Sequence, residues 1–284
     1  MEIRKVAVVG GGRMGRQIAL NAAINGYEVK VTDNIAAVLE DIEKWKEQYL
    51  AERITKGRMT EQQVADTKAR FAVVTSTEAA VCDADLVIEA VLERVELKKE
   101  VITEICKYAP KEAIITTNSS RMPASWFREC VNDTSKLCNL HYNNPALVMK
   151  AVEIQQNELT SEDTIETLKE FCRSCGKIPL HLRKENDGLI VSHLLGALNH
   201  AAMKLVEDGI CDIEDVDNGC VYGLGHPMGV FRLNDLTGLD LSYDIRREKF
   251  EKTGIKDPGY DMIEERVKQG RLGKRVGKGW YDYD

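Results

Sequence analysis

A glycine-rich turn close to the N-terminus constrains the fold more than any other feature of the sequence. The apolar run Val6 to Val9 predicts a buried strand, and Gly10, Gly12 and Gly15 follow it with the spacing GxGxxG. A helical pattern comes next and ends at Gly26, and "YEVKVTD" then alternates like a second strand. Strand, glycine turn, helix and strand in this order predict the first βαβ unit of a dinucleotide-binding domain.

Each part of this unit has a physical reason to bind a dinucleotide. Gly10 permits the tight turn, Gly12 lets the backbone approach a pyrophosphate, and Gly15 lets helix and strand pack closely. The amides at the helix N-terminus, at Arg13 and Met14, favour phosphate. The second strand ends at Asp33, whose carboxylate would accept the ribose hydroxyls and repel a 2′-phosphate, so we expect NAD as the cofactor.

Strands and helices continue to alternate through the first two thirds of the chain. This order predicts an α/β fold, a Rossmann-type and mostly parallel sheet that binds ligands at the carboxyl ends of its strands. The alternation is interrupted after Asp33 by a charged helix over residues 36 to 56 and by a second helix that a Thr60–Gln63 capping box would open. We expect this pair of helices to form a hairpin inserted between strands, either as a packing arm or as a clasp for substrate.

The strand signals stop near Glu185, and the remainder of the chain has helical patterns. We therefore predict an NAD-binding domain over residues 1–184 and an all-helical substrate and dimerisation domain over residues 185–284. The first helix of the second domain, within "GLIVSHLLGALNHAAMKLVEDG", is more apolar than one small core needs. A homodimer interface would use the excess.

Composition excludes several other classes of protein. The formal net charge of −7 argues against non-specific nucleic-acid binding, which needs a basic surface. No signal peptide and no apolar run of membrane-spanning length is found, so we expect a cytoplasmic protein without a membrane partner. The lone CxxC at Cys172 and Cys175 has no second pair to complete a zinc site, so we interpret both thiols as buried packing residues and expect no metal.

Three polar positions fall at predicted strand ends and are candidates for chemistry. Ser119 ends "AIITTNSS", His141 ends "KLCNLH", and Glu153 lies on the next segment, "VMKAVEI". A turn at Asn144–Pro145 and a returning strand would bring Glu153 beside His141, where the carboxylate would fix the tautomer of the ring. From spacing alone, a packed or surface histidine remains open and is the commoner case for one isolated histidine.

Longer motifs resemble one family over essentially the whole chain. They are "VVGGGRMGRQIA", "DLVIEAVLERVELKKEV", "TTNSS", the H-x-x-N-P…V-M-K-x-V-E run, "YGLGHPMGVFRLNDLTGLD" and "GRLGKRVGKGWYDY". The chain is similar to the short-chain L-3-hydroxyacyl-CoA dehydrogenases, including the 3-hydroxybutyryl-CoA dehydrogenases. The resemblance implies an NAD-dependent oxidoreductase of fatty acid metabolism that acts at the 3-position of an acyl-CoA.

The resemblance also implies roles for individual residues. His141 would be the general base, Glu153 would orient it, and Ser119 would hydrogen-bond the substrate oxygen. The cofactor cleft would be lined by Glu93, Lys98, Asn118, Ser119 and Asn144. The helical hairpin, with Arg53 and Lys56, would be the place for the coenzyme A phosphates.

Four positions depart from the family pattern near the expected active site. Asn143 replaces an aromatic residue, Arg121 an apolar one, Ser192 a substrate-contacting Asn, and His193 an Arg. Ser192 stays a candidate catalytic contact, and Asn143, Arg121 and His193 are candidate substrate contacts. The departures leave two alternatives open: a dehydrogenase of a free, polar or carboxylate-bearing 3-hydroxy acid, and a catalytically silent NAD-binding sensor or structural protein. Acyl-chain length and the direction of the reaction do not follow from the sequence.

Overall fold

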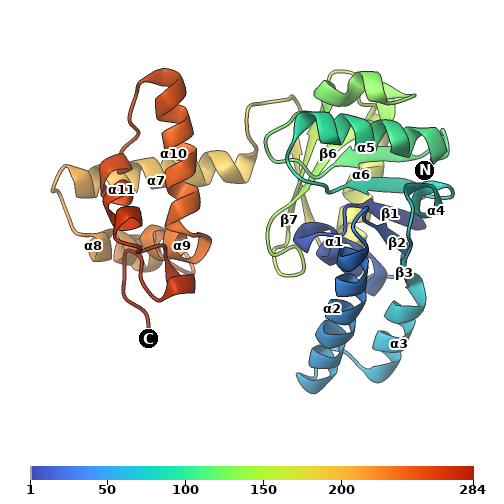
Figure 1. The fold of residues 1–284 in the computed structure, drawn as a ribbon, viewed down its shortest axis with the longest axis horizontal. Helices are drawn as coiled ribbons and strands as arrows, with labels where there is room; N and C mark the ends of the chain where they lie inside the picture. Colours follow the sequence, from blue (N-terminus) through green and yellow to red (C-terminus); the bar gives the residue numbers. More distant parts are fainter. Residues whose placement is uncertain (1) are drawn as a thin grey trace. The chain divides into compact units, whose positions relative to one another are not determined.

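Two compact units make up the chain in the computed structural model, which describes residues 2–284. Contacts between residues place the first unit at residues 1–190 and the second at residues 191–284. Figure 1 shows an α/β first unit and a second unit made of helices. No helix among residues 2–284 is long and apolar enough to span a membrane.

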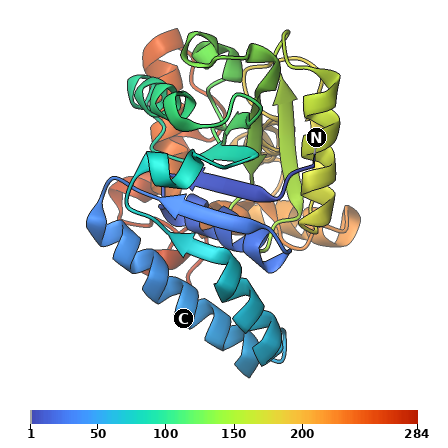
Figure 2. The ribbon, with the colours of Figure 1, turned by 90° about the vertical axis from the view of Figure 1, so that its right-hand side faces the viewer.

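An eight-stranded sheet is the centre of the first unit, with the strand order β3-β2-β1-β4-β5-β6-β7-β8. The antiparallel pairing of β7 with β6 makes β7 and β8 run against the other six strands (Figure 2). The predicted Rossmann-type, mostly parallel sheet is therefore confirmed. The strands are β1 (Lys5–Val9), β2 (Glu28–Thr32), β3 (Phe71–Val73), β4 (Leu86–Glu89), β5 (Ile114–Thr117), β6 (Leu137–Tyr142), β7 (Ala151–Gln156) and β8 (Ile178–Leu182).

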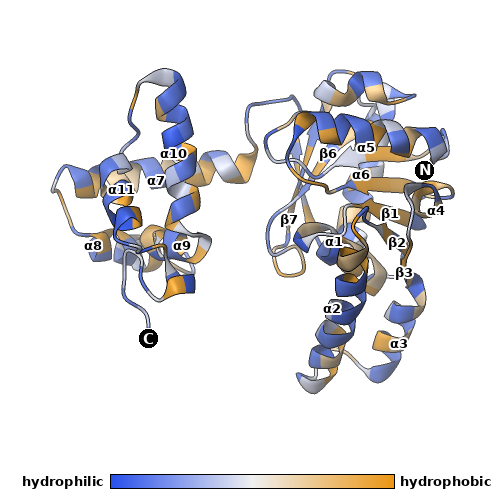
Figure 3. Ribbon diagram, in the orientation of Figure 1, coloured by the Kyte–Doolittle hydropathy of each residue, from blue (hydrophilic) through white to orange (hydrophobic). Residues whose placement is uncertain are grey.

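Alternating side chains of the central strands pack into two separate apolar cores, one on each face of the sheet. In β1, Val6 and Val8 pack on one face, and Ala7 and Val9 pack on the other. One core includes α1 (Arg13–Ile24), α2 (Ala36–Thr55), α3 (Glu61–Arg70) and α6 (Glu162–Ser174). The other includes α4 (Thr77–Val81), α5 (Val95–Tyr108) and the 3₁₀ segment η1 (Ala124–Cys130). Because both faces are covered, every residue of β4 and β5 is buried. Apolar residues are frequent in the strands of the sheet (Figure 3).

The predicted helical hairpin is present as α2 and α3, which lie side by side and extend away from the sheet (Figures 1 and 2). Only three residues of the long α2 are buried, which explains its charged surface. The capping box at the start of α3 is confirmed, because the Thr60 side chain accepts from the Gln63 amide and the Gln63 side chain accepts from the Thr60 amide.

The cysteine pair lies where the sequence predicted, at the end of α6. Cys172 and Cys175 are both buried in the apolar core of the first unit. Burial raises the pKa of the Cys175 thiol to about 12 and raises that of Cys172 further. This environment supports the interpretation of both cysteines as inert packing residues.

The second unit has its own apolar core. It contains α7 (Ile190–Glu207), α8 (Ile213–Asn218), the π-helical turn η3 (Gly219–Gly223), α9 (Val230–Thr237), α10 (Leu239–Thr253), α11 (Tyr260–Lys268) and a short 3₁₀ turn, η4 (Lys274–Val276). Phe231 meets Trp280 edge to face at 4.8 Å, which ties the C-terminal segment to α9. The buried Asp235 accepts hydrogen bonds from the amides of Trp280 and Tyr281, so the same segment is also held by polar contacts.

Candidate active site

The register of the antiparallel β6–β7 pair places His141 directly opposite Glu153. The Nδ1 atom of His141 lies 3.0 Å from Oε2 of Glu153. The carboxylate is almost fully buried, with a side chain 1% exposed, whereas the histidine side chain is 17% exposed. A carboxylate in this position holds Nδ1 as the protonated nitrogen and leaves Nε2 as the basic one.

A short connection between β6 and β7 keeps the two side chains in register. It contains the cis peptide bond between Asn144 and Pro145. The side-chain amide of Asn143 donates to the carbonyl of Ala151 at 3.3 Å, which bridges the ends of the two strands. Lys177, which is 6% exposed, donates from Nζ to the carbonyls of Ala146 and Met149 and so holds the connection in place.

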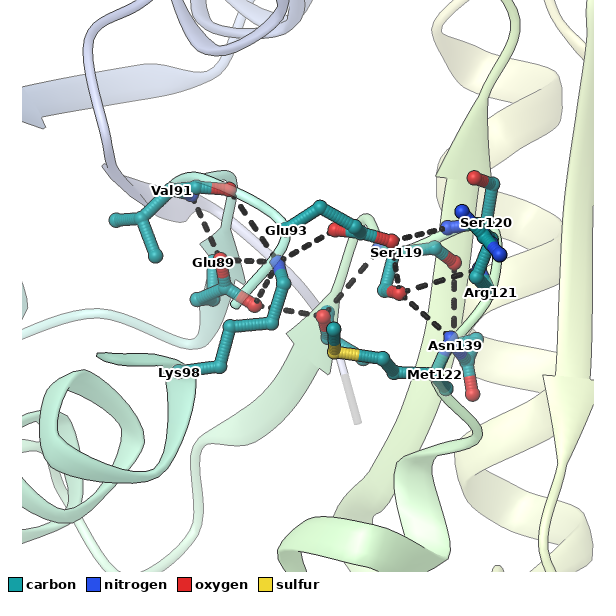
Figure 4. A network of polar contacts seen from close by, with 10 residues as sticks. Glu89, Val91, Glu93, Lys98, Ser119, Ser120, Arg121, Met122 and Asn139 are labelled. Carbon is teal, nitrogen blue, oxygen red and sulfur yellow. Dashed lines mark hydrogen bonds and ion pairs between the residues drawn. The ribbon is translucent and has the colours of Figure 1, made fainter. Parts of the chain in front are cut away.

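Ser119 follows the neighbouring strand β5 and is fixed on several sides. Its hydroxyl donates to Oε1 of Glu93, and its Oγ accepts from the amide of Met122 at 2.8 Å (Figure 4). The side chain of Asn139, buried on β6, donates to the carbonyls of Ser119 and Met122. The serine therefore has one orientation imposed by the fold before any ligand binds.

Asn118 connects this serine turn to the strand that carries the histidine. Its side-chain Oδ1 accepts from the backbone amide of Tyr142 at 2.8 Å, and its backbone amide donates to the carbonyl of Glu89. The strand ends β4, β5 and β6 are thus joined at one edge of the sheet, where a doubly wound sheet binds its ligands.

The glycine turn after β1 lies at the same edge and matches what a dinucleotide requires. A Cβ on Gly15 would lie 1.8 Å from the carbonyl oxygen of Gly10, so close packing of α1 on the turn excludes a side chain there. A Cβ on Gly12 would meet nothing within 4 Å, which leaves the backbone open to a pyrophosphate at the start of α1.

Asp33 directly follows β2, next to this turn. Its Oδ2 accepts from the amide of Gly11 at 2.8 Å and its Oδ1 from that of Ile35 at 3.0 Å. Each carboxylate oxygen can accept further bonds, so these contacts orient Asp33 without exhausting it. The open Gly12 and the oriented Asp33 are the features of the structure that fit NAD.

Comparison with known proteins agrees with this arrangement. The profile of the "3-hydroxyacyl-CoA dehydrogenase, NAD binding domain" matches residues 5–186, and that of the "3-hydroxyacyl-CoA dehydrogenase, C-terminal domain" matches residues 188–283. The chain belongs to the 3-hydroxyacyl-CoA dehydrogenase family. It is an oxidoreductase of this family with NAD as its cofactor.

Three relatives illustrate the family membership of this dehydrogenase. The mitochondrial hydroxyacyl-coenzyme A dehydrogenase of Rattus norvegicus is 35% identical over 99% of this chain and 91% of its own length. The 3-hydroxyadipyl-CoA dehydrogenase of Escherichia coli is 32% identical over 100% of this chain and 60% of its own. The crystal structure of FadB2 from M. tuberculosis superposes with a TM-score of 0.87 at 31% identity, covering all of both chains.

The dehydrogenase keeps some predicted site residues away from solvent. Lys98 is 1% exposed, and its Nζ is surrounded by Glu89, the Val91 carbonyl and Glu93. The pKa of Glu93 is lowered: its partial burial raises the pKa, but the charge of Lys98 and the hydrogen bonds from Ser119 and Lys98 outweigh that effect. Direct contact between Lys98 and the cofactor stays a prediction, whereas Glu93, which is 38% exposed, is accessible to a ligand.

The remaining predicted contacts lie on several different elements of the dehydrogenase. Arg121 is exposed, two residues beyond Ser119. On α2, Arg53 stacks over Tyr49 with 4.4 Å between its guanidinium carbon and the ring centroid, and Lys56 pairs with Glu52. Ser192 and His193 are exposed near the start of α7, in the second unit. The first unit therefore assembles His141, Glu153, Ser119, Glu93, Asn118 and the glycine turn, and the roles of Arg53, Lys56, Ser192 and His193 stay predictions.

Three buried polar residues of the site were not anticipated from the sequence. Glu89 and Thr117 end β4 and β5, and Asn139 lies within β6. Only Glu89 left a signal that could have been used, because a carboxylate that closes the apolar run "DLVIEAV" is rare in a buried strand without a partner.

Proposed function

We propose that this dehydrogenase interconverts a 3-hydroxyacyl-CoA and a 3-ketoacyl-CoA, with His141 as the acid-base group. The observation that carries the proposal is the His141–Glu153 pair, which strand register aligns at 3.0 Å beside a turn that holds Ser119. A histidine oriented by a buried carboxylate, at the ligand-binding edge of an NAD domain, suits removal of a hydroxyl proton. The rat relative, named for hydroxyacyl-coenzyme A, supports the same class of substrate.

The chemistry follows from the side chains. In the oxidative direction, Nε2 of His141 accepts the proton of the 3-hydroxyl group, and the buried Glu153 stabilises the imidazolium that results. NAD, when bound, accepts the hydride that leaves the same carbon. In the reductive direction the imidazolium returns the proton to the oxygen.

Ser119 requires one adjustment before it can contact a substrate oxygen. In this structure its hydroxyl hydrogen points to Glu93. Donation to the substrate oxygen therefore needs the O–H bond to rotate away from that carboxylate. Glu93 and the substrate compete for the same donor, so Glu93 would restrain the serine until the substrate enters.

An assay of NADH oxidation tests the substrate class. Acetoacetyl-CoA, acetoacetate and a 3-ketodicarboxylyl-CoA such as 3-oxoadipyl-CoA would be compared at equal concentration. Turnover of CoA thioesters with none of acetoacetate is the expected result. Turnover of the free acid alone would replace the proposal with the alternative of a polar 3-hydroxy acid, and NADH binding without any turnover would indicate a silent NAD-binding protein.

A carboxylate-bearing acyl-CoA is the second candidate substrate. Arg121 is exposed next to the Ser119–Ser120 turn, and a guanidinium can bind a carboxylate through two parallel hydrogen bonds. The relative from E. coli is named for 3-hydroxyadipyl-CoA, a substrate of this kind. Under this candidate, Arg121→Met would raise the KM for 3-oxoadipyl-CoA about tenfold, since a charged contact contributes about 1.5 kcal/mol, and leave the KM for acetoacetyl-CoA unchanged. Equal effects on both substrates would contradict it.

We also propose that the dehydrogenase is a homodimer that uses the second unit. Along α7 only Ala202 and Met203 are buried, although the helix is rich in apolar residues. Several large apolar side chains of this unit, on α7 and beyond it, are at least half exposed, namely Leu194, Ile210, Tyr222, Leu224, Leu236, Leu241, Ile245 and Ile255. A second copy would cover such a surface. Light scattering during size-exclusion chromatography should give a mass near twice 31.9 kDa, and a monomer mass at micromolar concentration would contradict the proposal. The cytoplasmic location stays a prediction.

A further inference from the structure

We infer that Glu89 is a positioning residue for both sides of the site. It holds the backbone beside the glycine turn through the amide of Val91, and it acts on Ser119 through the buried Lys98. This inference rests on the proposed function and adds a residue to its site. Glu89 is fully buried at the carboxyl end of β4, between Val9 at the end of β1 and Thr117 at the end of β5. It is therefore a buried charge at the centre of the ligand-binding edge.

Each oxygen of the Glu89 carboxylate accepts two hydrogen bonds. Its Oε1 accepts from Nζ of Lys98 at 2.8 Å and from the amide of Val91 at 2.7 Å. Its Oε2 accepts from Nζ of Lys98 at 3.0 Å and from the hydroxyl of Thr117 at 2.6 Å. Four hydrogen bonds from three donor groups around one buried anion define a single geometry, because loss of any one leaves an uncompensated polar group.

The first consequence is at the glycine turn. The bond from Val91 fixes the backbone immediately after β4, and this backbone is what Gly10 packs against. A Cβ on Gly10 would lie 2.6 Å from the carbonyl carbon of Ala90 and 2.8 Å from the amide nitrogen of Val91. A shift of residues 90–91 would therefore move the turn that faces the cofactor.

The second consequence is at the serine. Glu89 holds Lys98 so that its Nζ also lies 3.2 Å from Oε2 of Glu93, while Oε1 of Glu93 receives the hydroxyl of Ser119 (Figure 4). The order of contacts is Glu89, Lys98, Glu93 and Ser119. Thr117 adds a shorter connection, because its Oγ1 accepts from the amide of Ser119 at 3.3 Å. One buried carboxylate thus sets the position of groups on two sides of the site.

Glu89→Gln tests this inference, with Thr116→Val as the matched control. Thr116 is a buried neighbour on β5 whose hydroxyl donates to the carbonyl of Val87 rather than to the carboxylate of Glu89. Three quantities would be measured: the Kd for NADH by fluorescence, kcat with acetoacetyl-CoA per NADH-binding site, and the thermal midpoint. For Glu89→Gln we expect a weaker Kd and a kcat about 100-fold lower, since misplacement of a positioned group by about 1 Å has effects of that size. For Thr116→Val we expect kcat within about twofold of the wild type.

A double variant keeps the test decisive if Glu89→Gln does not fold. Glu89→Gln with Lys98→Met removes both buried charges at similar volume, so we expect a folded protein that binds NADH. Its kcat should stay low because Glu93 has lost its cation. A wild-type kcat in the double variant, or an unchanged kcat per site in Glu89→Gln with only a lower thermal midpoint, would show a structural role and overturn the inference.

The outcomes separate this inference from the proposed function. A wild-type protein without turnover of any 3-ketoacyl-CoA would refute the function. The NADH affinities of Glu89→Gln and Thr116→Val would then still test the hold of Glu89 on the glycine turn, and equal affinities would overturn that part.

Discussion

At the scale of single residues, the strongest prediction concerns the two histidines of the sheet. His141 bonds to a buried carboxylate, whereas His181 on β8 lies 2.7 Å from the side-chain oxygen of Gln156. His141→Gln should lower kcat by about 10³-fold, within the range for loss of a general acid-base group, and leave the Kd for NADH nearly unchanged. His181→Gln is the matched control and should keep wild-type turnover. Turnover that survives the first change would show that His141 is not the base.

At this scale, the sequence predicted the contact between residues on two consecutive strands that a short connection joins. The pairing of His141 with Glu153 could be predicted because a turn and a returning strand fix which residues face each other. The partners of Ser119 could not, since Glu93 and Asn139 lie on other elements at separations of 26 and 20 residues. The burial of Lys98 was equally hidden, because nothing in the local pattern shows that a helix turns this lysine onto a strand end.

At the scale of elements, the capping box of α3 gives a local prediction. Thr60→Ala removes the bond to the Gln63 amide and should destabilise the start of α3 by about 1 kcal/mol. Faster amide hydrogen exchange over residues 61–64 is the measurement. Thr55→Ala is the control, since its hydroxyl bonds only to the Ala51 carbonyl one turn back in α2 and should leave α3 unchanged. Equal exchange in both variants would show that the cap does not hold the helix.

Elements with strong periodicity were predicted well, and short ones were missed. The helical hairpin, the strands and the helices of the second unit match the structure. The long helices repeat their apolar pattern over several turns, whereas a buried strand is recognised from a short apolar run between turn signals. The helix α4 spans only five residues and η1 is a 3₁₀ segment of seven. Segments of this length show too little of a period to be recognised, and packing on the sheet decides their conformation.

At the scale of the whole molecule, the separate cores of the two units lead to a prediction about unfolding. Asp235 is 1% exposed and anchors the C-terminal segment through the amides of Trp280 and Tyr281 and the hydroxyl of Tyr283. In Asp235→Asn an NH2 group replaces one carboxylate oxygen and would face groups that themselves donate hydrogen bonds. We therefore expect the second unit to lose about 3 kcal/mol of stability. For a unit of this size, the midpoint of its transition should fall by more than 10 °C.

The first unit should not share this loss, because its cores are built from other residues and contain the glycine turn and Asp33. Scanning calorimetry of Asp235→Asn should therefore show an earlier transition for the second unit, while the Kd for NADH at 20 °C stays at the wild-type value. Asp240→Asn provides the comparison: its carboxylate pairs with Arg275 at the surface, where an ion pair contributes less than about 1 kcal/mol. If Asp235→Asn instead shifts one common transition and weakens NADH binding in parallel, the two units fold as a single cooperative body, and stability in the helical unit is a condition for cofactor binding in the other.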